Sequence, residues 1–113
     1  MNLFLTSILL SLFAETKETP TPVATFSIVA MDPDTGEIGV AVQSKIVAVG
    51  AVVPWAKANV GAVATQSFAN VTYGKEGLRL LEMGKNPEEV VKSLITKDPK
   101  KDLRQVGILS ANG

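Results

Sequence analysis

Apolar residues dominate two seven-residue segments on either side of a turn near residue 35. Thr25–Met31 and Ile38–Ser44 are rich in β-branched residues and enclose Asp-Pro-Asp-Thr-Gly at 32–36, which is typical of a turn. The pattern predicts a β-hairpin. Both strands carry apolar residues at odd and even positions, as strands do when both of their faces are covered. We therefore expect this hairpin to lie inside a layered domain.

A second pair of apolar segments follows, over 47–53 and 60–65, on either side of a Pro-Trp corner at 54–55. Small residues dominate both segments. Small side chains in strands favour the close approach of another sheet or of a ligand. The pattern predicts a second pair of strands that packs closely against a neighbouring layer.

The periodicity then changes to that of helices. Leucines mark a helix over 74–83 that ends at Gly84, a residue often found just after a helix. Asn86 is a good N-cap and Pro87 a good first residue for a second helix. Asp98-Pro99 ends that helix.

The last residues predict one more strand, over Arg104–Ser110, followed by the hairpin signal Asn112-Gly113. The predicted order is four strands, two helices and a strand, in an α+β domain whose sheets lie between helix layers. Because the hairpin signal stands at the end of the sequence, we expect the N-terminal part of a longer domain, with an incomplete sheet.

The first 24 residues differ from the rest. The apolar run at 3–13 is too short to cross a bilayer as a helix, and Ala14 suits a signal-peptide cleavage site. The segment 15–24 is polar and contains two prolines, which is typical of an extended linker. We predict a signal peptide at 1–14, a linker at 15–24 and a domain at 25–113, in a secreted or periplasmic protein without a stable membrane span. The alternative is an uncleaved membrane-associated or core helix.

Composition excludes several classes of function. Eleven Lys and Arg balance eleven Asp and Glu, without the basic excess that nucleic-acid binding requires. The chain contains no His and no Cys, which excludes His-dependent triads, Cys nucleophiles and Cys/His zinc sites within it. We expect no cofactor, no metal and no nucleic-acid partner. A nucleophile must be Ser, Thr, Lys or a carboxylate.

Thr25 is the candidate nucleophile, because it begins a strand directly after the linker. A Thr at a mature N-terminus can attack an amide with its own α-amine as the base. If Asp32 pairs with Glu37, Thr25 faces Ser44, whereas a shift of one residue places Lys45 there. Ser44 would relay a proton, and Lys45 would lower the pKa of the hydroxyl or amine by its charge. An ordinary solvated strand end is the alternative.

Polar side chains also gather behind the second apolar pair. Amide and hydroxyl groups at a strand end are candidates for holding a substrate carbonyl or an oxyanion. The alternative is ordinary loop chemistry before a helix. The candidate substrate-binding residues are Gln66, Ser67, Asn70 and Tyr73.

Several longer stretches carry a resemblance to a known family. They include Thr-Phe-Ser-Ile-Val-Ala-Met-Asp-Pro at 25–33, Ala-Val-Gly-Ala-Val-Val-Pro-Trp-Ala at 48–56 and Val-Gly-Ala-Val-Ala-Thr-Gln at 60–66. With them the chain resembles, from Thr25 to its end, the bacterial and archaeal family called domain of unknown function 1028, which is grouped with the Ntn (N-terminal nucleophile) hydrolases. The resemblance implies the four-layer αββα sandwich of those enzymes, here as its N-terminal part, with Thr25 in the nucleophile position.

The chain departs from the family pattern in two ways. Members usually begin with Met followed by this Thr, whereas residues 1–24 precede it here, so exposing Thr25 requires a further or autocatalytic cleavage. Proteasome-like Ntn enzymes have an Asp near the end of the second strand, where this chain has Ser44 and Lys45. Their proton network therefore does not transfer to this chain.

The leading hypothesis is an exported Ntn-type amidohydrolase that acts on a small-molecule or peptide-like substrate. Thr25 is the nucleophile, its α-amine the base, and Ser44 or Lys45 orients the hydroxyl. Some family members carry a peptidoglycan-binding module, which implies a role in the cell envelope. The alternative is a non-catalytic envelope binding or assembly domain with the same fold, and a homo-oligomer is expected because Ntn folds often stack.

Overall fold

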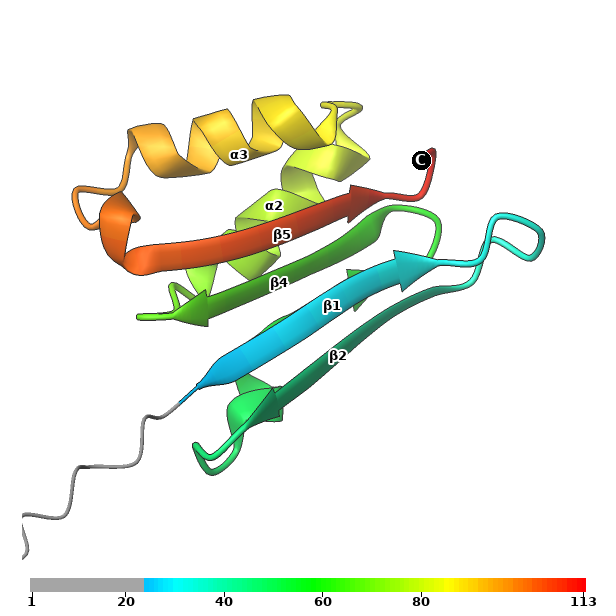
Figure 1. The fold of residues 1–113 in the computed structure, drawn as a ribbon. Helices are drawn as coiled ribbons and strands as arrows, with labels where there is room; N and C mark the ends of the chain where they lie inside the picture. The colour runs from blue at the N-terminus through cyan, green and yellow to red at the C-terminus, as the bar shows by residue number, and fades with distance from the viewer. Residues whose placement is uncertain (1–23) are drawn as a thin grey trace, which may run out of the picture.

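The computed structural model describes residues 24–113, which form two antiparallel sheets and two helices (Figure 1). The signal peptide and linker predicted for 1–14 and 15–24 lie outside these residues, apart from Ala24. The element order of four strands, two helices and a strand agrees with the prediction. Sheet A consists of β1 (Thr25–Met31) and β2 (Ile38–Ser44).

Sheet B has the order β3-β4-β5, and β4 is antiparallel to both of its neighbours. The helices lie on one face of sheet B and sheet A on the other, which makes three layers (Figure 1). The remaining elements are β3 (Pro54–Lys57), β4 (Gly61–Ser67), β5 (Arg104–Ser110), α2 (Thr72–Glu82), α3 (Pro87–Thr96) and the 3-10 turns η2 (Val49–Ala51) and η3 (Lys101–Leu103).

The β1–β2 hairpin has the first of the two registers that the sequence leaves open, with Thr25 opposite Ser44. The N–H of Asp32 donates to the carbonyl of Glu37 over 2.9 Å, and Gly36 supplies the positive φ of +74° that the turn requires. Thr25 consequently stands opposite Ser44. The turn alone therefore decides which polar side chain meets the candidate nucleophile.

The second strand pair differs from the prediction in its first member. The segment 47–53 is not a strand, because it contains η2, and β3 begins only at Pro54. Ala48 adopts a left-handed conformation with φ of +60°, which takes the chain out of an extended path. Apolar composition alone does not distinguish a packed turn from a strand.

Helix α3 begins as predicted. The Asn86 side-chain oxygen accepts the Glu89 N–H over 2.9 Å, and the Glu89 carboxylate accepts the Asn86 N–H over 3.0 Å, with Pro87 in the first turn. This reciprocal pair is a capping box. It satisfies two N–H groups that the helix itself leaves without partners.

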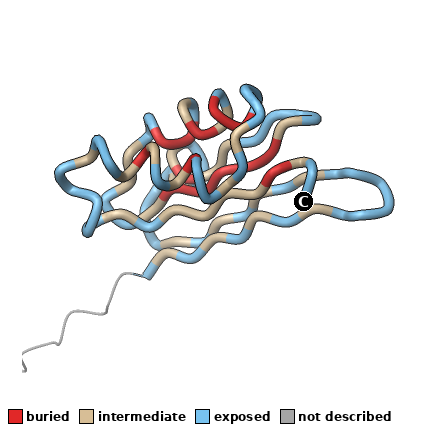
Figure 2. The backbone as a smooth tube through the Cα atoms, turned by 90° about the horizontal axis from the view of Figure 1, so that it is seen from above, coloured by how far each residue is buried: buried red, intermediate tan, exposed pale blue. Residues whose placement is uncertain are grey.

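The hydrophobic core lies between the helices and sheet B, where Figure 2 shows most of the buried residues. Val63 of β4 faces α2, since a Cβ added at Gly77 would lie 3.1 Å from its Cγ2. Alternation along the strand then turns Ala62 and Ala64 toward sheet A, and both are buried. The small residues let the two sheets approach closely, as the sequence predicts. The main core cluster is Tyr73, Leu80, Leu81, Val90 and Leu94.

The outer face of sheet A is uncovered within residues 24–113. The sequence predicts strands covered on both faces, but no described element covers this face, and Phe26 and Ile28 are 67% and 61% exposed. Burial alternates along both strands, with only the face toward sheet B protected. Apolar residues on two faces show that a face can be covered, but they do not identify the covering segment. No helix in the described part is long and apolar enough to cross a membrane.

Candidate functional site

Thr25 lies at the edge of the space between the two sheets, where its hydroxyl meets that of Ser44. The two oxygens are 2.8 Å apart, and either hydroxyl can donate. The Ser44 oxygen also accepts the N–H of Ile46 over 3.1 Å. Both side chains are half-buried on the protected face of sheet A. The pair can hold the Thr25 hydroxyl in one orientation and pass a proton along the contact.

Lys45 does not occupy the position opposite Thr25. The register pairs Thr25 with Ser44, and Lys45 follows the last residue of β2 in an exposed position. Of the two partners that the sequence leaves open, Ser44 is the one in contact. An effect of the Lys45 charge on the Thr25 amine stays a prediction.

Gln66 ties the start of β1 to sheet B. Its amide nitrogen donates to the Thr25 carbonyl over 3.0 Å and to Oε1 of Gln105 over 2.8 Å. Its amide oxygen accepts the Ser27 hydroxyl over 2.8 Å. With its amide engaged at both ends, Gln66 positions the backbone of Thr25. The sequence analysis missed Ser27 and Gln105, although the strand periodicity of Thr25 and Ser27 could have suggested the first of them.

A cavity of about 180 Å³ lies between the sheets beside this network. Residues of β1 form one wall, and residues of β4 and β5 form the other. The cavity has a polar part next to Gln66 and an apolar remainder. Its lining residues are Ser27, Val29, Ala64, Gln66, Gln105, Val106 and Gly107.

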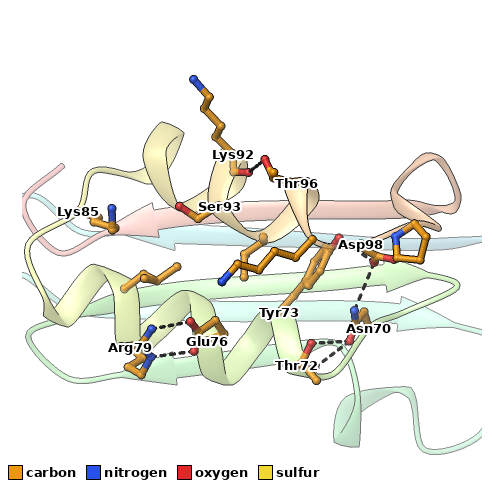
Figure 3. Close-up of a pocket in the computed structure, with 14 residues that line it drawn as sticks. Asn70, Thr72, Tyr73, Glu76, Arg79, Lys85, Lys92, Ser93, Thr96 and Asp98 are labelled. Atoms are coloured by element: carbon orange, nitrogen blue, oxygen red, sulfur yellow. Dashed lines mark hydrogen bonds and ion pairs between the residues drawn. The ribbon is translucent and has the colours of Figure 1, made fainter.

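Two of the four candidate substrate-binding residues lie on the other side of sheet B. Tyr73 donates its hydroxyl to Asp98 over 2.8 Å, and Asn70 donates its side-chain amide to the same oxygen over 3.3 Å (Figure 3). Gln66 is therefore near Thr25, whereas Asn70 and Tyr73 lie on the helix side of sheet B, where both bind Asp98. Ser67, the last residue of β4, is exposed and has a positive φ of +70°. The structure does not bring the four together.

Asp98 is the centre of a polar network that joins α2, the loop after α3 and β5. Its carboxylate accepts from Arg104 over 2.9 Å and from the N–H of Lys100 over 2.8 Å, and its side chain is 7% exposed. The hydrogen bond from Arg104, followed by that from Lys100, holds the pKa of Asp98 well below its usual range. Burial, and then the bond to Asp98, raise the pKa of Tyr73 to about 12. Among the described residues, no buried side-chain polar atom lacks a hydrogen-bond partner, so the network is a structural link.

The sequence analysis interpreted Asp98 only as a helix terminator. The signal that it overlooked is the clustering of an acid and a base within six residues, at Asp98 and Arg104. Tyr73 precedes Asp98 by 25 positions, and the contact between them depends on how the helices fold back on sheet B.

A larger cavity of about 850 Å³ lies between α2 and α3 (Figure 3). Leu80 and Leu94 line it together with the basic residues Lys85 and Lys97. It is on the helix side of sheet B, away from Thr25. A ligand there would not reach the Thr25 hydroxyl, so the space between the sheets is the better candidate site despite its smaller volume.

The acidic residues of the described chain do not form a metal centre. Within residues 24–113, no group of three or more acidic side chains could hold a metal ion. The Asp32 carboxylate instead accepts the N–H groups of Asp34 and Thr35, over 2.8 and 3.2 Å. It closes the β1–β2 turn in this way.

Comparison with known proteins adds a family and a structural relative. The family model described as "Family of unknown function (DUF1028)" matches residues 25–113. The crystal structure of protein SPO2555 from Silicibacter pomeroyi, which carries the same family description, is similar, with a TM-score of 0.75 and 33% sequence identity. The match covers 80% of this chain and 42% of that chain, so this chain spans less than half the length of that structure. None of the curated proteins matches.

Proposed function

Because this chain belongs to the family of unknown function DUF1028, whose name assigns no reaction, we propose its function from the site at Thr25. The proposed activity is that of an exported Ntn-type amidohydrolase with an N-terminal Thr nucleophile, acting on a peptide-like or small-molecule amide. The main support is the contact of 2.8 Å between the hydroxyls of Thr25 and Ser44. A hydroxyl held by a neighbour in this way is oriented before substrate arrives.

In the proposed reaction, the free α-amine of Thr25 takes the proton from Oγ1 as this oxygen attacks the amide carbonyl carbon. The tetrahedral intermediate collapses, its C–N bond breaks, and the protonated amine gives its proton to the leaving nitrogen. Water then hydrolyses the resulting ester with the same amine as base, which releases the acid and restores Thr25. Ser44 orients the hydroxyl throughout, and Gln66 fixes the Thr25 backbone.

We further propose the four-layer αββα sandwich as the complete architecture. Residues 24–113 contain a helix layer and two sheets, and Phe26 and Ile28 are exposed on the outer face of sheet A. A second helix layer on this face would complete the sandwich and remove that apolar surface from water. The greater length of the solved relative is consistent with this proposal.

Catalysis by this route requires that Thr25 become the N-terminus. A signal peptide at 1–14 would place the protein in the periplasm or outside the cell, and the segment 15–24 must then be removed by a second or autocatalytic cut. Intact-mass measurement of the exported full-length protein tests this requirement directly. We expect a chain that begins at Thr25.

Covalent labelling tests the nucleophile. A β-lactone probe acylates an activated Thr hydroxyl, and we expect one adduct per chain, located at Thr25 by peptide mapping. Thr25→Ala should remove the adduct. Thr35→Ala is the matched control, because Thr35 lies in the exposed β1–β2 turn, and it should leave the adduct in place. An active sample in which Thr25 is never the N-terminus would contradict the mechanism.

The second candidate function is a non-catalytic envelope binding or assembly domain. The observation in its favour is the exposed apolar face that Phe26 and Ile28 form on sheet A. In this case another subunit, rather than a second helix layer, covers the face. Association would then be indifferent to Thr25→Ala, whereas the enzyme would lose its labelling.

A further inference from the structure

We propose that the cavity of about 180 Å³ between the sheets binds the aliphatic side chain of the substrate, next to the amide bond that Thr25 attacks. This inference rests on the proposed function of Thr25 and names the substrate class: a peptide-like amide whose residue at the scissile bond is Val, Leu or Ile. The position, the size and the lining of the cavity support this inference.

The cavity adjoins Thr25 through two residues of its polar part. Ser27 lies two positions after Thr25 on the same face of β1, a separation of about 6.6 Å at the usual rise per residue. Gln66 donates to the Thr25 carbonyl over 3.0 Å, and both Ser27 and Gln66 line the cavity. A group bound beside Ser27 therefore lies about two strand residues from the nucleophile.

The volume and lining select an aliphatic group. An apolar protein cavity of about 150 Å³ holds benzene, so this slightly larger space accommodates a branched aliphatic side chain. Val29, Ala64 and Gly107 form the apolar part of the lining, and no lining residue is charged. Val106 borders the cavity as well, but its side chain packs against the core on the helix side of sheet B. A charged side chain would lose its hydration there without gaining a partner, which is strongly unfavourable.

The polar part suits the amide that accompanies such a side chain. Gln105 accepts a hydrogen bond from Gln66 through its side-chain oxygen. Among residues 24–113, no acceptor binds the Gln105 side-chain nitrogen, so this N–H group is available to a substrate carbonyl. The cavity thus offers an apolar space for an aliphatic side chain. Beside it lies one amide donor for the backbone carbonyl of the same peptide unit.

Gly107 allows the cavity to be filled without disturbing the fold. A Cβ at this position would lie 3.9 Å from Val29 Cγ2, an ordinary contact distance, and Gly107 is in the middle of β5, where β-branched residues are favoured. Gly39 provides the matched control. It lies on the exposed face of β2, and an added Cβ there meets nothing within 4 Å.

The experiment is a titration of the full chain with N-acetyl-L-leucinamide, followed by the backbone amide NMR signals of Ser27, Gln66 and Gly107. We expect saturable shifts at these residues and none with the glutamate analogue. Gly107→Val should weaken binding about tenfold or more, because the valine side chain would occupy part of the space that the ligand needs. This is the effect of losing one or two methylene contacts in an apolar pocket. Gly39→Val should bind as the wild type does.

Two outcomes overturn the inference: equal affinity of Gly107→Val and wild type, or shifts confined to other parts of the chain. If Gly107→Val fails to fold, Gly107→Ala gives the same comparison with one added methyl group. Comparison of N-acetyl-L-leucinamide binding and β-lactone labelling in the wild type separates the two proposals. Leucinamide binding that persists when β-lactone labelling is absent from the wild type refutes the nucleophile and supports the cavity, whereas labelling without binding refutes the cavity alone.

Discussion

The hydroxyl oxygens of Thr25 and Ser44 lie 2.8 Å apart, although the two residues are 19 positions apart in the chain. Hairpin register brings them together, and the bond from Gln66 to the Thr25 carbonyl holds the strand end in place. A strand end that is tied down on two sides does not behave as a frayed terminus. This relationship makes the reactivity of Thr25 testable one partner at a time.

Removal of the Ser44 hydroxyl should slow acylation of Thr25 without unfolding the protein. One neutral hydrogen bond contributes about 0.5–1.5 kcal/mol, so Ser44→Ala should lower the β-lactone labelling rate about two- to twelvefold. The rate is measured by intact mass against time. Gln43→Ala is the control, because Gln43 is the preceding residue and lies on the exposed face of β2. Unaltered labelling of a folded Ser44→Ala protein would show that Ser44 does not orient the hydroxyl.

Loss of the Tyr73 hydroxyl should destabilise the fold through Asp98. Hydrogen bonds to charged groups contribute about 1.5–3 kcal/mol, and Tyr73 is 2% exposed, with its hydroxyl 2.8 Å from the Asp98 carboxylate. We expect Tyr73→Phe to lower the free energy of unfolding by about 2 kcal/mol in urea titrations. Ser93→Ala removes a surface hydroxyl bonded to the Glu89 carbonyl. This control should change the free energy of unfolding by less than about 0.5 kcal/mol. Equal stability of the two variants would refute a structural role for the Tyr73–Asp98 bond.

The same residue should limit stability at alkaline pH. Burial raises the pKa of Tyr73 from 10.0 to about 12 in the folded chain, so the neutral phenol is favoured there. Its contribution is complete below the unfolded pKa and is lost as pH rises from about 10 through 12. Unfolding free energies measured across this range should fall more steeply for wild type than for Tyr73→Phe. Parallel curves would contradict the raised pKa.

Gly74 should tolerate no side chain, although it lies in a helix. Alanine is normally the better helix residue by about 1 kcal/mol. A Cβ at Gly74 would overlap the ring of Trp55, whose N–H is bonded to the Val52 carbonyl over 2.8 Å. Overpacking of this kind costs about 1–3 kcal/mol, so Gly74→Ala should lower the melting temperature. Lys75→Ala, at the adjacent exposed position of α2, should leave the melting temperature unchanged. A stabilised Gly74→Ala protein would show that α2 and Trp55 are not in close contact.

The exposed face of sheet A should drive self-association if another copy covers it. The double substitution of Phe26→Ser and Ile28→Ser removes two large apolar side chains that are mostly in water, so the unfolding free energy should change little. Light scattering should show a smaller particle for this variant than for wild type. Met83→Ser is the control, because Met83 is 64% exposed at the end of α2 and away from this face. A monomeric wild-type chain would exclude this mode of assembly.

Features that depend on neighbouring residues were predictable from the sequence. The bounds of β1, β2 and β5 and the capping of α3 agree with the structure, because turns and caps are set within a few positions. The hairpin turn limited the partner of Thr25 to Ser44 or Lys45, and the observed register selects Ser44. The first member of the second strand pair was wrong, since the left-handed Ala48 and η2 leave no mark in the apolar pattern.

The sequence by itself determined the strand and helix order, the absence of His and Cys chemistry, and two candidate partners for Thr25 at the end of the hairpin, of which the structure selects Ser44. Only the tertiary structure decided that Gln66 joins Thr25 while Tyr73 joins Asp98, and that one face of sheet A is exposed. The physical reason is distance along the chain. Turn and capping energies act between near neighbours, whereas contacts between layers depend on how whole sheets and helices pack, and no residue spacing encodes that packing directly.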